Sequence, residues 1–216
     1  MNVGKMKKTI IITLLLSVFC SSVFSQNERK LSKEEKVVFE QKMLEQSKKI
    51  KTLQCNFIQE KTSQLIADKA VSKGFLLYES PSKLRWEYAE PTVSTLILNG
   101  KNAVLLDKMG KPIGNVNMLK QLGNIIISMI NGDGLQQNKQ FSTEVFETDN
   151  KLILVVLTPV QKRMKEFYDS IELKIDQKTF LASEISMNEK SGDKMRIYFN
   201  NKKTNETISA DKFAVK

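Results

Sequence analysis

Side chains that commonly carry out catalysis are scarce in this sequence. None of its 216 residues is a histidine, which excludes histidine-based nucleophile activation, acid–base catalysis and histidine metal ligands. The chain also lacks a nucleophile-elbow motif, a phosphate-binding loop and a glycine-rich dinucleotide turn. Its paired acids Glu34 and Glu35 lie in a charged helical stretch, which is typical of a solvated face. We therefore predict no catalytic residue, no metal site and no cofactor, and an enzyme is the weakest functional hypothesis.

The residue pattern does favour one kind of chemistry, the binding of apolar groups. Leu84, Trp86 and Tyr88 alternate with other residues, so in a strand their side chains point to one face of a sheet. We predict that this face lines an apolar chamber, although the same residues would also suit an ordinary core. The neighbouring strands would add Leu76, Tyr78, Leu96 and Leu98.

A helix is predicted over residues 117–130, because apolar residues recur there at helical spacing. Asn117 is suited to cap its start and Gly132 its end. One face of this helix would form a movable lid over the chamber, where flexible methionines suit a surface that must repack. The predicted lid residues are Met118, Leu122, Ile126 and Met129.

An earlier helix is predicted from a capping box at Ser32 and Glu35 to about Lys51. Its charged face is rich in lysine and glutamate, and its apolar face would pack on the sheet. The apolar stripe comprises Val37, Val38, Phe39, Met43, Leu44, Ile50 and Leu53.

Most of the remaining chain alternates between apolar and polar residues and so predicts β-strands. Asn99-Gly100, between two such runs, is the strongest hairpin signal. No helical pattern separates the later strands, so we expect neighbours to pair antiparallel. A large antiparallel sheet must curl, close or be covered, and helices in its concavity would enclose the chamber. The expected strands are residues 55–60, 72–79, 83–89, 94–99, 103–107, 141–148, 152–157, 168–176, 181–187 and 195–199.

Residues 1–25 have the organisation of a secretory signal peptide. A lysine-rich start precedes a short apolar run, and cleavage is expected before Gln26. Cys20 raises the alternative of a lipoprotein signal. However, Ser17 and Phe19 stand where a lipobox requires an aliphatic and a small residue, so we favour cleavage without lipidation.

Removal of the signal peptide would leave residues 26–216 as a single domain. Cys55 would then be its one cysteine, so no intrachain disulfide is expected. The formal net charge of +10 is spread through the chain, which could favour anionic lipid surfaces or acidic partners but is more typical of a well-solvated basic surface. Together with export, this distribution argues against a nucleic-acid partner.

A series of short motifs follows the first predicted helix in a fixed order. An F-x-Q strand is followed by a glycine-led strand, a proline turn and an aromatic strand that ends in W-x-Y. An L-T-P motif and a terminal D-x-F motif complete the series. The segments are residues 57–59, 74–78, 81–88, Pro91, 99–101, 157–159 and 211–213. In this order, the motifs resemble the LolA family of periplasmic lipoprotein carriers.

This resemblance implies an α+β fold in which a strongly curved sheet forms an incomplete antiparallel β-barrel with an amphipathic helical lid. It implies a non-enzymatic periplasmic carrier that shields the acyl chains of lipoproteins between the inner and outer membranes. The implied partners are acylated lipoproteins or other lipid cargo, an inner-membrane ABC transporter and an outer-membrane acceptor, and we expect a monomer. The alternative is a periplasmic regulatory domain that senses lipids or lipoproteins on the same scaffold.

One position departs from the family pattern. Well-known members carry an arginine directly before the turn proline, where it ties the lid to the sheet, and here this position is Ser80. The nearby Arg85 is expected to face outward, because it alternates with Trp86. The sequence therefore does not predict how the lid is held, and it leaves open a divergent carrier or a carrier of another lipid.

Overall fold

One antiparallel sheet dominates the computed structural model, which describes residues 28–64, 69–114, 116–132, 135, 140–148 and 150–215. The predicted signal peptide, residues 1–25, lies outside the described residues. The strands are β1 (Arg29–Lys30), β2 (Thr52–Thr62), β3 (Ala70–Glu79), β4 (Lys83–Glu90), β5 (Ser94–Asn99), β6 (Asn102–Asp107), β7 (Phe141–Glu147), β8 (Leu152–Pro159), β9 (Tyr168–Asp176), β10 (Ala182–Glu189) and β11 (Lys194–Thr204).

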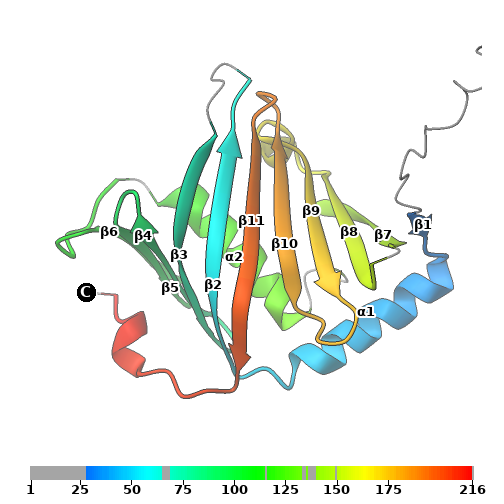
Figure 1. Cartoon of the computed structure of the whole chain (residues 1–216), viewed down its shortest axis with the longest axis horizontal. Helices are drawn as coiled ribbons and strands as arrows, with labels where there is room; N and C mark the ends of the chain where they lie inside the picture. The colour runs from blue at the N-terminus through cyan, green and yellow to red at the C-terminus, as the bar shows by residue number, and fades with distance from the viewer. Residues whose placement is uncertain are drawn as a thin grey trace, which may run out of the picture.

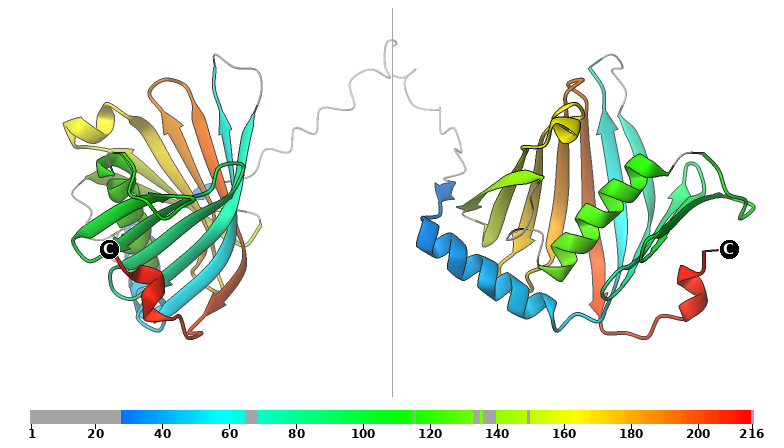
Figure 2. Two further views of the ribbon diagram at one scale, coloured as in Figure 1. Left: turned by 90° about the vertical axis from the view of Figure 1, so that its left-hand side faces the viewer. Right: turned by 180° about the vertical axis from the view of Figure 1, so that it is seen from behind.

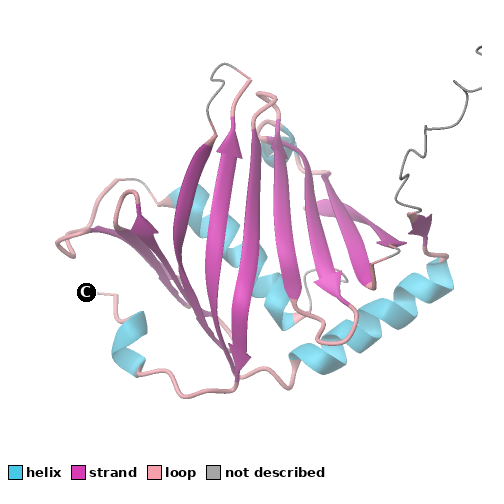
Figure 3. Ribbon diagram, in the orientation of Figure 1, coloured by secondary structure: helices cyan, strands magenta, loops and turns pink. Residues whose placement is uncertain are grey.

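Two meanders, β2 to β6 and β7 to β11, join where β11 pairs with β2. Strand β1 is added next to β7 and was not predicted, so the described part of the sheet has eleven strands rather than ten. The edge strands β1 and β6 do not pair with each other, and the curved sheet stays open (Figures 1 and 3). The predicted α+β fold with an incomplete antiparallel barrel is confirmed.

Two helices lie on the same side of the sheet. Seen from behind, α2 (Asn117–Asn131) crosses the sheet obliquely, and α1 (Lys33–Ser47) runs near the ends of the strands (Figure 2). Two short helices, α3 (Lys162–Lys165) and η1 (Ala210–Phe213), complete the described structure. On the opposite face η1 packs on β4 and β5, where Phe213 is fully buried. None of the helices in the described ranges has the length and apolar character needed to span a bilayer.

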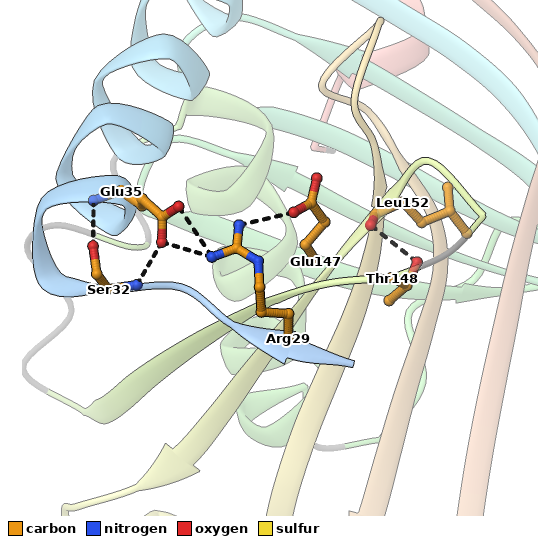
Figure 4. A network of polar contacts seen from close by, with 6 residues as sticks. All are labelled: Arg29, Ser32, Glu35, Glu147, Thr148 and Leu152. Carbon is orange, nitrogen blue, oxygen red and sulfur yellow. Dashed lines mark hydrogen bonds and ion pairs between the residues drawn. The ribbon is translucent and has the colours of Figure 1, made fainter. Parts of the chain in front are cut away.

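The start of α1 is fixed by the predicted capping box. The Ser32 hydroxyl accepts a hydrogen bond from the Glu35 amide at 3.1 Å, and the Glu35 carboxylate accepts one from the Ser32 amide at 2.8 Å. Arg29 of β1 bridges this carboxylate, at 3.0 Å, to Glu147 of β7, at 2.8 Å (Figure 4). The hydrogen bond from Arg29 lowers the pKa of Glu35. All of these groups are exposed, so the network orients β1 and contributes little stability.

The apolar face of α1 is narrower than predicted. Phe39, Met43 and Ser47 are buried at intervals of four residues and form a single stripe along the helix. Val37 and Val38, which were predicted to widen this stripe, are 51% and 48% exposed. The helix also ends earlier than predicted, at Ser47. It lies near the strand ends and covers the sheet with one narrow face, so the flanking valines remain in contact with solvent.

The two ends of α2 differ in how well they were predicted. Asn117 does not cap the start, because it is the first helical residue and Val116 occupies the cap position without a side-chain hydrogen bond. Gly132 ends the helix as predicted, with a φ of 76° that glycine adopts without strain. A Cβ atom at Gly132 would lie 2.9 Å from Leu44 Cα, so glycine also allows α2 to approach α1 closely.

Candidate functional site

The strand register brings the predicted chamber residues together on one face of the sheet. Six of them are at most 6% exposed, and Tyr88 is half-buried opposite Gly74. We call these seven residues the wall; their role in ligand binding stays a prediction. Cross-strand partners in β3, β4 and β5 form the rows Leu76, Trp86, Leu96 and Tyr78, Leu84, Leu98.

Helix α2 packs against the wall with the apolar face that the sequence predicts. Ile126 and Met129 are 4% and 5% exposed, and Leu122 is partly buried against the same cluster. The side chain of Met118, the fourth predicted lid residue, lies outside the described part of the structure. The helix thus has the position of a lid, although its movement is not observed.

Gly123 sets the close approach of α2 to the wall. A Cβ atom there would clash with Leu98 Cδ1 and lie 3.4 Å from Leu84 Cδ2. The absence of a side chain lets the helix backbone rest on β4 and β5. This contact explains a glycine within the helix, where its low propensity costs about 1 kcal/mol relative to alanine.

An aromatic cluster occupies the middle of the wall. The Phe57 ring of β2 lies 4.5 Å from the Trp86 ring and meets Tyr88 edge-on at 5.3 Å, measured between ring centroids. Phe199 of β11 meets Trp86 edge-on at 6.1 Å. Gly74 makes room for the cluster, because a Cβ atom there would lie 2.7 Å from the Phe57 ring. Phe57 and Phe199 were not among the predicted wall residues, although alternation along β2 and β11 carries that signal.

One buried polar atom in the chamber lacks a hydrogen bond. The indole nitrogen of Trp86 meets no acceptor in hydrogen-bond geometry among the described residues. The neighbouring Tyr88 hydroxyl donates to Gln59 Oε1 at 2.8 Å. Burial raises the pKa of Tyr88; Gln59 and the nearby indole N–H, which does not meet the Tyr88 hydroxyl in hydrogen-bond geometry, offset part of this rise. An unpaired buried N–H costs about 1–3 kcal/mol, and a ligand carbonyl would satisfy it.

Asn131, the last residue of α2, ties the lid to the sheet. Its side-chain amide donates to the Pro81 carbonyl at 2.9 Å, and its side-chain oxygen accepts a hydrogen bond from the Tyr78 hydroxyl. Its backbone carbonyl accepts a hydrogen bond from the Ser47 hydroxyl of α1. Asn131 therefore supplies a lid-to-sheet contact that the sequence could not assign at Ser80.

Little empty space remains between α2 and the sheet. The larger cavity, of about 40 Å³, lies between α1, α2 and strands β2, β3, β9, β10 and β11. A second cavity, of about 20 Å³, lies between α2 and strands β4, β5 and β6, and Ile126 lines both. Because an apolar cavity that binds a molecule as small as benzene has about 150 Å³, neither cavity can hold an acyl chain. The space of the predicted chamber is filled in this structure, and a long ligand could enter it only if α2 moved.

Most residues that line the larger cavity were not predicted as site residues, and two of them, Cys55 and Lys202, have ionisable side chains. Cys55 is 3% exposed, and burial raises the pKa of its thiol to about 12. Lys202 is half-buried, and its ammonium donates to the Ala182 carbonyl at 3.0 Å. Simple alternation misplaces Lys202, because the register of β11 shifts between Asn200 and Lys203.

Cys55 is expected to report whether the chamber is open. Its thiol is buried and has a pKa of about 12, so it should stay neutral and shielded in the closed state. An Ellman assay at about pH 8 should show modification at least about tenfold slower than in urea-unfolded protein. Equally rapid modification of the native protein would contradict the closed chamber. Cys55→Ser should fold, because serine has nearly the same size.

Comparison with known families identifies the relatives of this chain. Residues 48–216 match the family model described as outer membrane lipoprotein carrier protein LolA. The chain belongs to the LolA family. LolA proteins are periplasmic carriers without enzymatic activity, and the matched region includes the wall, α2 and η1. A search of curated proteins gave no match.

Solved structures similar to this LolA-family chain have low sequence identity to it. A LolA superfamily protein from Nitrosomonas europaea is 14% identical with a TM-score of 0.44, covering 81% of this chain and 97% of that one. The Mycobacterium tuberculosis lipoprotein LppX is 11% identical with a TM-score of 0.42, covering 83% and 100%. The Pseudomonas aeruginosa MucA/MucB complex is 11% identical with a TM-score of 0.46. The match covers 83% of this chain and 60% of that one.

Proposed function

We propose that this protein is a periplasmic carrier that shields the acyl chains of lipoproteins between the inner and outer membranes. The proposal rests mainly on the way in which helix α2 covers the wall. A separate amphipathic helix covers the wall, and the Asn131 contacts tie its C-terminal end to the sheet. Such a helix can leave the wall while the strand pairing of the sheet persists. The exposed face would then offer leucine and aromatic side chains to an acyl chain.

Burial of an acyl chain would supply the driving force for binding. Each methylene transferred from water to apolar surroundings contributes about 0.8 kcal/mol, so a chain of ordinary length gains on the order of 10 kcal/mol. Opening the lid exposes Ile126 and Met129, which are buried in the closed state, and this offsets part of the gain. A reduced net affinity suits a carrier that must release its cargo.

The unpaired indole N–H of Trp86 supports acylated cargo rather than a plain hydrocarbon. Lipoproteins carry ester or amide carbonyls next to their acyl chains. A carbonyl placed at Trp86 would accept the hydrogen bond that the closed chamber leaves unmade, which favours the bound state by removing the cost of the unpaired donor.

Family membership favours a route for the cargo. The chain would be exported after removal of residues 1–25 and would act as a monomer in the periplasm. An inner-membrane ABC transporter would deliver lipoproteins to it, and an outer-membrane acceptor would receive them. This route is part of the proposal and depends on membership in the LolA family.

Release of lipoproteins from membranes tests the proposed function. The purified protein is mixed with energised inner-membrane vesicles that contain a labelled lipoprotein, and the supernatant is separated by gel filtration. We expect a soluble complex of the two proteins. The matched control is the same lipoprotein with its lipid-carrying cysteine replaced by serine, which should not bind. Equal binding of both forms, or of neither, would rule the carrier function out.

Transfer to outer-membrane vesicles distinguishes a carrier from a sensor. A carrier should pass the labelled lipoprotein on to vesicles that contain the acceptor. A regulatory domain should bind the acylated form and retain it.

A further inference from the structure

A single charged residue interrupts the apolar lining of the larger cavity. Among the described residues that line it, Lys202 alone carries a charge, and the others are apolar side chains or the neutral thiol of Cys55. An ammonium group in such surroundings is costly unless it is paired and hydrogen-bonded. Its position therefore requires an explanation.

A β-bulge turns Lys202 toward the cavity. The register shift in β11 places two residues, Asn201 and Lys202, opposite the single residue Cys55 of β2. Asn201 adopts a positive φ of 51° at this point. In a regular strand every second side chain points to the same face, so without the bulge Asn201 would point inward like Phe199. The extra residue moves the inward position to Lys202.

No carboxylate lies within ion-pair distance of Lys202 in the part of the chain that the structure describes. Its ammonium donates to the Ala182 carbonyl at 3.0 Å. Asp176 acts on it only at longer range, and that carboxylate already accepts hydrogen bonds from the amides of Lys178 and Thr179 at 3.0 and 2.7 Å. Burial lowers the pKa of Lys202, which is the sign of a cation without full compensation.

We propose that Lys202 binds the anionic head of an acyl-chain ligand whose tail lies between Ile126, Met129 and the sheet. A carboxylate or phosphate oxygen would accept charge-assisted hydrogen bonds from the ammonium and replace the solvation that it lacks. The inference rests on the proposed acyl-binding function. It extends the cargo from the acyl groups of lipoproteins to amphiphiles with an anion at the end of the chain.

Ligands of equal chain length test this proposal: dodecanoate, dodecyl phosphate and the neutral methyl dodecanoate. The wild-type protein should bind at least one anion about tenfold or more tightly than the ester, because a hydrogen bond to a charged group contributes more than one between neutral groups. A preference for dodecanoate alone identifies a fatty-acid site, and a preference for dodecyl phosphate alone identifies a phosphate headgroup site.

Three variants assign the preference to the ammonium. Lys202→Met keeps the apolar stem and removes the charge, so it should lose the preference for anions and bind the ester at least as tightly as the wild type. Lys202→Arg should keep the preference. Lys203→Met is the matched control, because Lys203 is the exposed neighbour on the same strand, and it should bind all three ligands like the wild type.

Equal affinity of the wild type for anions and ester, or a preference that Lys202→Met retains, would overturn the role of Lys202 while leaving the proposed acyl binding intact. Failure of all three ligands to bind would overturn both proposals. Thermal unfolding without ligand gives an independent readout. Lys202→Met should unfold at the same or a higher temperature, because a desolvated charge is removed. A lower midpoint would show that Lys202 serves the fold through Ala182, and the proposal would be wrong.

Discussion

Replacing Trp86 with glutamate is expected to abolish the binding of a fluorescent fatty-acyl probe. Trp86 lies in the middle of the wall and is 5% exposed, so an acyl chain that enters the chamber would desolvate the new carboxylate. This desolvation costs several kcal/mol. Since 1.4 kcal/mol corresponds to a factor of ten, the affinity should fall at least about 100-fold. A fluorescence titration measures the loss, and circular dichroism records whether the sheet remains folded.

Leu122→Glu tests the same prediction if Trp86→Glu proves to be unfolded. Leu122 is only partly buried, so Leu122→Glu should weaken probe binding with a smaller effect on the fold. Met129→Asp places an acid deeper under the lid and should act in the same direction. If all three acidic variants unfold and the wild type binds no probe, the wall and α2 form an ordinary core and the chamber does not exist.

Arg85→Ala is the matched control on β4. Its guanidinium pairs with Glu87 at 2.7 Å and donates to the Lys212 carbonyl of η1 at 3.3 Å, so it lies on the face opposite the wall. The variant should bind the probe like the wild type. If it abolishes binding while Trp86→Glu does not, the inward and outward faces of β4 are assigned incorrectly.

Loss of the Asn131 contacts is expected to open the chamber. Asn131→Ala removes the acceptor of the Tyr78 hydroxyl and the donor to the Pro81 carbonyl. Tyr78 is 1% exposed, so losing this hydrogen bond in the closed state costs about 1–3 kcal/mol. The ratio of open to closed protein should rise about 5- to 150-fold. The rates of Cys55 modification and of probe uptake should rise together by a similar factor.

Two further variants control for the Asn131 experiment. Tyr78→Phe removes the other half of the hydrogen bond and should change both rates in the same direction. Asn99→Ala removes a side-chain amide that donates to the Phe213 carbonyl on the opposite face, at 3.1 Å, and should leave both rates unchanged. The latch would be refuted if Asn131→Ala accelerated Cys55 modification only by the factor by which it lowers the global stability in urea, because α2 would then open only with the whole fold.

Much of the wall was predictable because its geometry is local. The alternation of Leu84, Trp86 and Tyr88 depends on the period of a single strand, and the short hairpins around them fix the register with neighbouring strands. The Ser32–Glu35 capping box is local in the same sense, and the structure confirms it. Such features need no knowledge of distant segments.

The features that the sequence did not reveal depend on contacts between distant segments. Strand β1 has only two residues and exists through its pairing with β7. In the sequence, Asn131 is an ordinary polar residue at the end of a helix. Its role in tying the lid to the sheet becomes visible only in the structure, where it contacts Pro81 and Tyr78. The inward position of Lys202 results from a bulge, which changes which residues of β11 point inward. No local periodicity in the sequence indicates such a bulge.

Native mass spectrometry of the protein purified from periplasmic extract tests the central claim, that the chamber carries acylated cargo. We expect a population whose mass exceeds that of the chain after removal of residues 1–25, and dissociation should release an acylated lipoprotein. Protein with Trp86→Glu, purified in parallel, should lack this cargo. If the wild-type protein is empty, or carries only molecules without acyl chains, in cells that are exporting lipoproteins, the claim is contradicted.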